Sequence, residues 1–226
     1  QLNLSTTRIY PSYWELHGGT SYINDYSSVT GNPELQPYIN YEAQFNYIFK
    51  QKYVATLYFQ YGDKAAVQLP YQSPESLHLI YQTINMNYKR VAGINLYVPF
   101  NVSYIWNASA TANIFNQREK ADRFHHISFD NSKWIFYGSV NNSFKFSRDC
   151  PLSLTLDFAY ISPSLQGISD LSGLWKVDAG IKWNFGRKHC CELDIKADDI
   201  FNKWSPVMTI RHAGQDYRMA VRGMTR

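Results

Sequence analysis

Hydrophobic residues recur at every second position along most of this chain, in runs longer than a typical strand of a soluble protein. In "LWKVDAGIKWNF" (174–185) the odd-numbered residues are aromatic, aliphatic or alanine, whereas the even-numbered residues from Lys176 onward are charged, polar or glycine. Successive side chains of a strand point to opposite faces, so the run predicts a strand with one apolar and one polar face. The same alternation occurs in residues 41–49, 53–61, 134–146, 152–160 and 191–197. The chain is therefore predicted to be all-β.

The connections between these runs alternate between short and long. The short ones are 50–52, 99–102, 147–151 and 185–189, and the long ones are 17–37, 62–86, 118–132 and 162–172. This predicts an antiparallel meander of about ten long strands, with tight turns at one end and long loops at the other. We expect the strands at 1–9, 38–50, 52–62, 87–98, 103–117, 133–146, 151–161, 173–185, 190–212 and 216–226.

Two environments produce such two-faced strands. A soluble sandwich or barrel turns its apolar face inward, whereas a transmembrane barrel turns it outward to lipid. Soluble strands cluster near ~5–6 residues, and a tilted membrane-spanning strand needs ~9–11. Several runs here exceed the membrane length, which favours the lipid environment.

The spacing of the aromatic residues also favours a membrane. Trp175 and Phe185 lie on one face of their strand, ten positions apart, as do Trp134 and Phe144. Ten steps of ~3.3 Å, tilted by ~40°, span roughly 25 Å, the height of the apolar band between two aromatic girdles. The predicted girdle residues are Trp106, Trp134, Phe144, Phe146, Trp175, Trp183 and Phe185.

Charge and cysteine content exclude several classes of function. The 22 basic and 18 acidic residues are scattered, so the net charge of +4 does not favour a nucleic-acid partner. Cys150, Cys190 and Cys191 are odd in number and lack the spacing of a disulfide framework or a metal site.

Other chemistry-bearing residues also lack partners in the sequence. The adjacent histidines His125 and His126 point to opposite sides of an extended chain and cannot readily chelate one ion. Asp198 and Asp199 diverge in the same way, so we expect turn or rim contacts from them rather than acid–base chemistry. No nucleophile motif or phosphate loop is present in the sequence. We therefore predict no enzymatic activity, no cofactor and no bound metal. The residues do not identify a substrate-binding site.

A stiff bend, "GNPELQP" (31–37), precedes the second predicted strand. Pro33 and Pro37 fix φ and remove two backbone donors. Gly31 is expected to adopt a backbone conformation that other residues resist.

Together with "RIYPSYWEL" (8–16), this bend resembles a pattern in the barrels of TonB-dependent receptor-like outer-membrane proteins of the Bacteroidetes type. Further similarities follow in the order of that family, with Asp198 standing where the family usually has asparagine: "WIFYGSVNNSF" (134–144), "YISPSLQGI" (160–168), "LWKVDAGIKWNF" (174–185) and "ADDIFN" (197–202).

The resemblance implies that residues 1–226 form the C-terminal portion of a barrel of about 22 strands in the cell outer membrane. It also implies that the plug and the N-terminal half lie outside the chain, and that "MAVRGMTR" ends partway down the closing strand. The implied function is import of a nutrient, such as a siderophore, glycan or peptide. The implied partners are membrane lipid, TonB acting through the plug, and a surface lipoprotein.

Two other classes fit the residues alone. One is a structural or adhesive outer-membrane barrel that transports nothing. The other is a soluble carbohydrate-binding β-sandwich whose aromatic residues stack on sugars.

Overall fold

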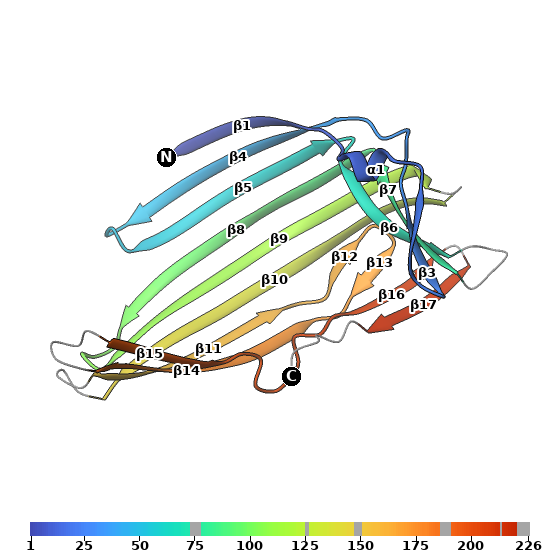
Figure 1. Ribbon diagram of the computed structural model, residues 1–226. Coiled ribbons are helices and arrows are strands. Elements are labelled where there is room, and N and C mark those ends of the chain that lie inside the picture. Colours follow the sequence, from blue (N-terminus) through green and yellow to red (C-terminus); the bar gives the residue numbers. More distant parts are fainter. Residues whose placement is uncertain (73–77, 125–126, 147–150, 186–190, 213, 221–226) are drawn as a thin grey trace.

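The computed structural model describes residues 1–72, 78–124, 127–146, 151–185, 191–212 and 214–220 (Figure 1). Its main feature is a curved nine-stranded antiparallel sheet in the order β1-β4-β5-β8-β9-β10-β11-β14-β15. Within the described residues the sheet stays open, because β1 and β15 each pair with a strand on one side only. The strands are β1 (Leu2–Ile9), β4 (Tyr38–Phe49), β5 (Tyr53–Asp63), β8 (Tyr88–Asn101), β9 (Trp106–Phe124), β10 (Ile127–Lys145), β11 (Leu152–Ile161), β14 (Leu174–Phe185) and β15 (Cys191–Ala197).

The predicted long strands are confirmed for six of these elements, β1, β4, β5, β8, β11 and β14, to within a few residues. The tight turn at 50–52 is also confirmed, with Lys50 and Gln51 both at positive φ. The turn predicted at 99–102 is shifted, because β8 continues to Asn101. The turns predicted at 147–151 and 185–189 lie largely outside the described residues.

The prediction of a loop over 118–132 is wrong. This segment continues β9 and β10 as a long hairpin whose strands pair as far as Phe124 and Ile127; residues 125–126 lie outside the described residues. Its charges suggested a loop, but cross-strand pairing accommodates them: Arg118 Nε and Nη2 donate to the Asp130 carboxylate at 2.8 and 2.7 Å.

The long strand predicted at 190–212 is also wrong, whereas the strand predicted at 216–226 is confirmed as far as Ala220, and residues 221–226 lie outside the described residues. β15 ends at Ala197, and a turn separates it from β16 (Val207–His212) and β17 (Gln215–Ala220), which belong to a different sheet. Asp199 causes the break. Its backbone is left-handed, with φ of 47°, and its carboxylate accepts the backbone N–H groups of Lys203 and Trp204 at 2.9 Å each. The turn role expected for Asp199 is therefore confirmed.

The remaining long connections are folded rather than irregular, so the described residues hold seventeen strands instead of ten. One four-stranded sheet has the order β2-β3-β7-β6, and a second has the order β12-β13-β16-β17. We call these two sheets the cap; they lie at the end of the main sheet opposite the tight turns (Figure 1). The elements not yet bounded are α1 (Tyr13–Leu16), β2 (Thr20–Asn24), β3 (Ser27–Thr30), β6 (Ala66–Gln72), β7 (Leu79–Asn85), β12 (Ser164–Gln166) and β13 (Ser169–Leu171).

The buried core lies where the cap meets the ends of β9 and β10. Strands β9 and β10 contribute the odd-numbered residues Ala121, Ile127 and Phe129 to this core. Along the middle of the sheet, the odd-numbered side chains of these two strands form the polar face. The same face is therefore apolar where it meets the cap. The core residues are Ala65, Leu69, Ile84, Met86, Ala121, Ile127, Phe129, Ile168 and Ile210. The long connections therefore bury a common apolar cluster.

The "GNPELQP" bend is held by contacts to the cap. Asn32 donates a side-chain hydrogen bond to Thr83 O at 3.0 Å, and Gln36 N donates to Asn85 Oδ1 at 2.8 Å. The expected reason for Gly31 is wrong, because its φ is not in the left-handed region. Glycine is required by space instead: a Cβ at this position would lie 1.8 Å from His17 O.

Gly93 in β8 offers a test of the sheet packing. Tyr58 of β5 donates its hydroxyl proton to Asn113 Oδ1 of β9 at 2.9 Å, past Gly93 on the strand between them. A Cβ at Gly93 would lie 2.5 Å from Phe115 Cβ, 2.7 Å from Ile114 O and 2.8 Å from the Tyr58 hydroxyl.

We predict that Gly93→Ala destabilises the folded sheet by about 1–3 kcal/mol, the usual cost of overpacking. The measurement is thermal unfolding in detergent micelles. Gly138→Ala is the matched control, because its Cβ would meet only the ring of Phe136, which can rotate away. Equal unfolding temperatures for the two variants would contradict the packing described here.

Candidate functional site

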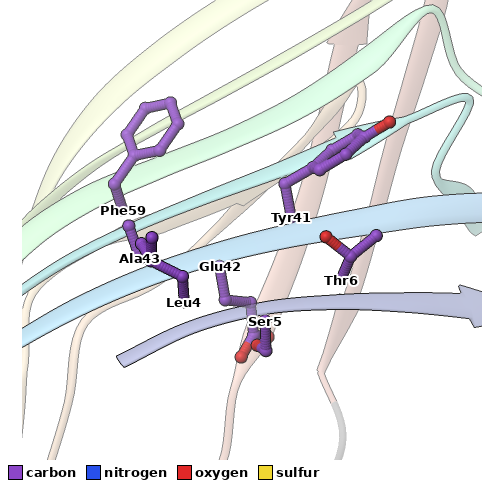
Figure 2. A pocket seen from close by; sticks show the side chains of 7 residues that line it. All are labelled: Leu4, Ser5, Thr6, Tyr41, Glu42, Ala43 and Phe59. Atoms are coloured by element: carbon purple, nitrogen blue, oxygen red, sulfur yellow. The ribbon is translucent and has the colours of Figure 1, made fainter. Parts of the chain in front are cut away.

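The two faces of the main sheet differ in chemistry, as the alternation predicts. Leu4, Ala43 and Phe59 are cross-strand neighbours on β1, β4 and β5. Figure 2 shows these side chains on one side of the sheet, whereas Ser5 and Glu42 of the adjacent row point to the other side. A shallow hollow of about 300 Å³ lies at this edge of the sheet.

The apolar face extends across all nine strands without a covering layer in the described part of the chain. Large aliphatic side chains at the middle of the sheet are strongly exposed: 52% for Leu57, 45% for Ile114 and 48% for Ile181. Register places Ile181 beside Leu154 on one side and Ile195 on the other. Soluble monomers rarely expose apolar surface on this scale. A soluble β-sandwich would need a second sheet packed on this face. In the described part of the chain, the buried core lies at the cap instead.

The predicted girdle residues all lie on or beside this apolar face. Near the tight turns, the rings of Trp106 and Phe144 stack at 5.8 Å, and those of Trp183 and Phe185 lie 4.9 Å apart. Phe146 follows β10 at the same end and is exposed.

Toward the cap, Trp134 is 68% exposed, and the Trp175 ring lies 5.6 Å from that of Phe201. Phe201 was not predicted, because it follows the end of β15, where no alternation indicates its direction. Lipid contact by these rings stays a prediction.

The opposite face forms a polar wall rich in amide and hydroxyl groups that bond to one another. Thr56 Oγ1 and Gln44 Nε2 both donate to Asn46 Oδ1, at 2.8 and 3.2 Å. Several charged residues of the wall form ion pairs, as in Lys182–Glu192 at 2.8 Å. Such a surface suits a water-filled interior that polar solutes can contact.

At the cap end, the β12–β13 hairpin folds over this polar wall and is fastened there by Glu119 of β9. The carboxylate is fully buried and accepts from Gly167 N at 2.5 Å, from Gln117 Nε2 at 2.7 Å and from Lys89 Nζ at 3.0 Å. Asn131 adds a hydrogen bond to Gly167 O at 2.8 Å. Burying a carboxylate is tolerated only with such partners, so the hairpin and the wall are held as one unit.

Gly167 has a specific reason to be glycine. It lies at the tip of the hairpin with φ of +58°, and a Cβ there would approach Leu69 Cδ2 of the core to 2.3 Å. Sequence reasoning missed both Glu119 and Gly167, because it assigned 118–132 and 162–172 to loops. No short motif marks either residue.

The other residues weighed from the sequence do not form a reaction centre in the described part of the chain. Cys150, Cys190, His125 and His126 lie outside it, and Cys191 is exposed at the start of β15. No group of three or more His, Cys, Asp or Glu side chains among the described residues is arranged to hold a metal ion. No helix in the same residues is long and apolar enough to cross a membrane.

Comparison with known proteins identifies the class of membrane protein. Residues 1–225 match the outer membrane protein beta-barrel family, so the chain belongs to that family. A search of curated proteins finds no match. The protein is therefore located in the outer membrane, where its apolar face lies against lipid.

We predict that Glu119→Ala loosens the β12–β13 hairpin. The change leaves buried donors without an acceptor, which costs about 1–3 kcal/mol and should speed local amide exchange roughly tenfold to a hundredfold. The measurement is hydrogen–deuterium exchange of residues 164–171. Glu192→Ala is the control, since its exposed ion pair with Lys182 contributes about 0–1 kcal/mol. Unchanged exchange in Glu119→Ala would show that the carboxylate does not fasten the hairpin.

Proposed function

We propose that the chain forms part of the barrel wall of a TonB-dependent importer that brings a small polar nutrient across the outer membrane. Membership of the outer-membrane barrel family gives the setting. The ordered resemblance of the "GNPELQP", "LWKVDAGIKWNF" and "ADDIFN" segments to TonB-dependent receptor-like proteins supports the finer assignment.

The observation that carries the proposal is the hairpin folded over the polar wall. Outer-membrane barrels have short periplasmic turns and longer extracellular loops, so the cap lies on the outer side. A passive pore needs a continuous wet path between the two sides. The buried Glu119 contacts fasten Gly167 and its hairpin to the polar wall at the cap end; in the proposed importer this hairpin would obstruct the outer end of that path. A wall closed at rest fits a transporter that opens only when driven.

The parts of the chain would then have distinct roles. The apolar face anchors the wall in lipid, the cap provides an outer surface that meets the nutrient, and the polar wall offers replaceable hydrogen bonds along the route inward. Energy would come from TonB acting through a plug. A surface lipoprotein is a further partner that the resemblance implies.

Two assays on the complete protein that contains this chain test the proposal. We expect it to bind the purified periplasmic domain of TonB, and to show no steady ion conductance in planar bilayers because the outer end is closed. A porin of known conductance is the positive control for the bilayer assay.

Each contrary result would assign the protein to a different functional class of outer-membrane barrel. Steady conductance without TonB would mean a passive pore. A closed barrel that does not bind TonB would mean a structural or adhesive barrel. Either result would overturn the import function while leaving the outer-membrane assignment intact.

A further inference from the structure

The apolar face of the main sheet changes character toward the cap, one row of side chains beyond Trp134. Cross-strand register places Ala92 and Asn116 in the row of Trp134. The next row contains Tyr61, Arg90 and Arg118, and the row after it contains Tyr88, Lys120 and Asp130. We call these six residues the rim. Because Arg118 lies four residues after Ile114 on β9, the rim continues the face that lies against lipid.

Aromatic rings mark the depth of the rim in the membrane. The rings of Tyr61 and Tyr88 stack with their centroids 6.0 Å apart, and the ring of Tyr41 on β4 lies 6.4 Å from that of Tyr61. Tyrosine rings are enriched at the boundary between hydrocarbon and headgroups, and long cationic side chains reach from that level into the headgroup layer. The rim therefore lies at the level of lipid headgroups.

The rim carries three cations and one carboxylate, and one of the cations is uncommitted. Arg118 forms a two-point contact with Asp130, and Lys120 Nζ lies 3.8 Å from Asp122 Oδ1. The exposed guanidinium of Arg90 has no ion-pair or hydrogen-bond partner within the described residues. A guanidinium with free donors is suited to two-point binding of a phosphate group. Arg90 therefore offers a phosphate site at headgroup level.

A cavity of about 590 Å³ lies beyond the rim, and its volume is within the range of small-molecule sites. Asp63, which lines it, is the cross-strand neighbour of Tyr88, so the cavity begins one row, or ~7 Å, beyond Arg90. The carboxylates of Asp63 and Glu34 have no partner in the described part of the chain and can accept from hydroxyl groups. Four amide side chains also line the cavity: Asn32, Gln36, Asn85 and Asn87. Rim and cavity together suit a headgroup in which a phosphate adjoins sugar hydroxyls.

We propose that the rim and this cavity bind the headgroup of a phosphorylated glycolipid of the outer leaflet. Arg90 binds the lipid phosphate, Lys120 adds positive charge one row further, and the Asp63 carboxylate accepts from a sugar hydroxyl. The acyl chains lie on the adjoining apolar face, which favours a lipid over a soluble sugar phosphate. The inference goes beyond the proposed import: it shares only the outward orientation of the cap, and neither TonB nor a nutrient enters it.

The test is native mass spectrometry of the complete protein that contains this chain, in detergent micelles with three lipid probes. Diphosphoryl lipid A carries phosphates on a sugar headgroup, phosphatidylglycerol carries a phosphate without a sugar, and digalactosyldiacylglycerol carries sugars without a phosphate. We expect lipid A to bind about tenfold or more tightly than either of the other two, because each lacks one set of contacts. Water-soluble glucosamine 1-phosphate, which has no acyl chains, should not displace lipid A at equal concentration.

Variants locate the lipid. Arg90→Gln is expected to weaken lipid A binding about tenfold or more, and Arg90→Lys by only several-fold, because lysine keeps the charge. Asp63→Asn is expected to weaken lipid A binding by several-fold and to leave phosphatidylglycerol binding unchanged. Lys196→Gln is the matched control, because Lys196 is an exposed cation of the same sheet, opposite Gly180 on the polar wall. Thermal unfolding of each variant in micelles checks that it is folded.

Three results would overturn the proposal. Equal binding of either control lipid would show that the phosphate or the sugar is not recognised. Displacement by glucosamine 1-phosphate at equal concentration would show that the ligand is not a membrane lipid, and unchanged lipid A binding in Arg90→Gln would place the lipid elsewhere. The TonB-binding assay on the same preparation separates the two claims. Lipid A binding without TonB binding keeps the rim site and rejects import, and the reverse keeps import and rejects the rim site.

Discussion

Contact between one face of the main sheet and hydrocarbon is the interaction on which the rest of this structure depends. The backbone polar groups between neighbouring strands are paired in the ladder, as a membrane requires. The side chains of the apolar face, by contrast, have no protein layer over them; Ile181 and Leu57 are about half exposed in the described chain. In water such a face would be an aggregation hazard. Lipid removes that hazard, so the sheet and the membrane form one folded unit.

The cap meets a different requirement, at the end of the sheet opposite the tight turns (Figure 1). There the strands of β9 and β10 rise beyond the apolar band, and the chain needs a core of its own. Leu69, Met86 and Ile210 supply it from segments far apart in sequence. Glu119 joins this core to the polar wall through Gly167 and Lys89. The same contacts that stabilise the cap also fasten the β12–β13 hairpin to the polar wall.

The sequence predicted the part of the fold that has a simple period. Alternation placed Trp175, Ile181 and Phe185 on one face, and register across β11, β14 and β15 agrees. It did not predict the cap, because strands such as β12, with three residues, are too short to show a period and form only when distant segments pack together. For the same reason no sequence signal pointed to Glu119. The sequence indicated that a glycine is needed at position 31. The reason is the close approach of His17 O, a tertiary contact that the local sequence does not show.

The most direct test of the central claim is a spin-label scan along β14 of the reconstituted protein. Single cysteines at positions 177 to 182, in a background without native cysteines, would be examined by electron paramagnetic resonance for collisions with oxygen and with a water-soluble nickel chelate. Labels at Val177, Ala179 and Ile181 should meet oxygen and exclude nickel, and labels at Asp178, Gly180 and Lys182 should show the reverse, with a period of two. Nickel access at the odd positions, or uniform behaviour along the strand, would contradict the account.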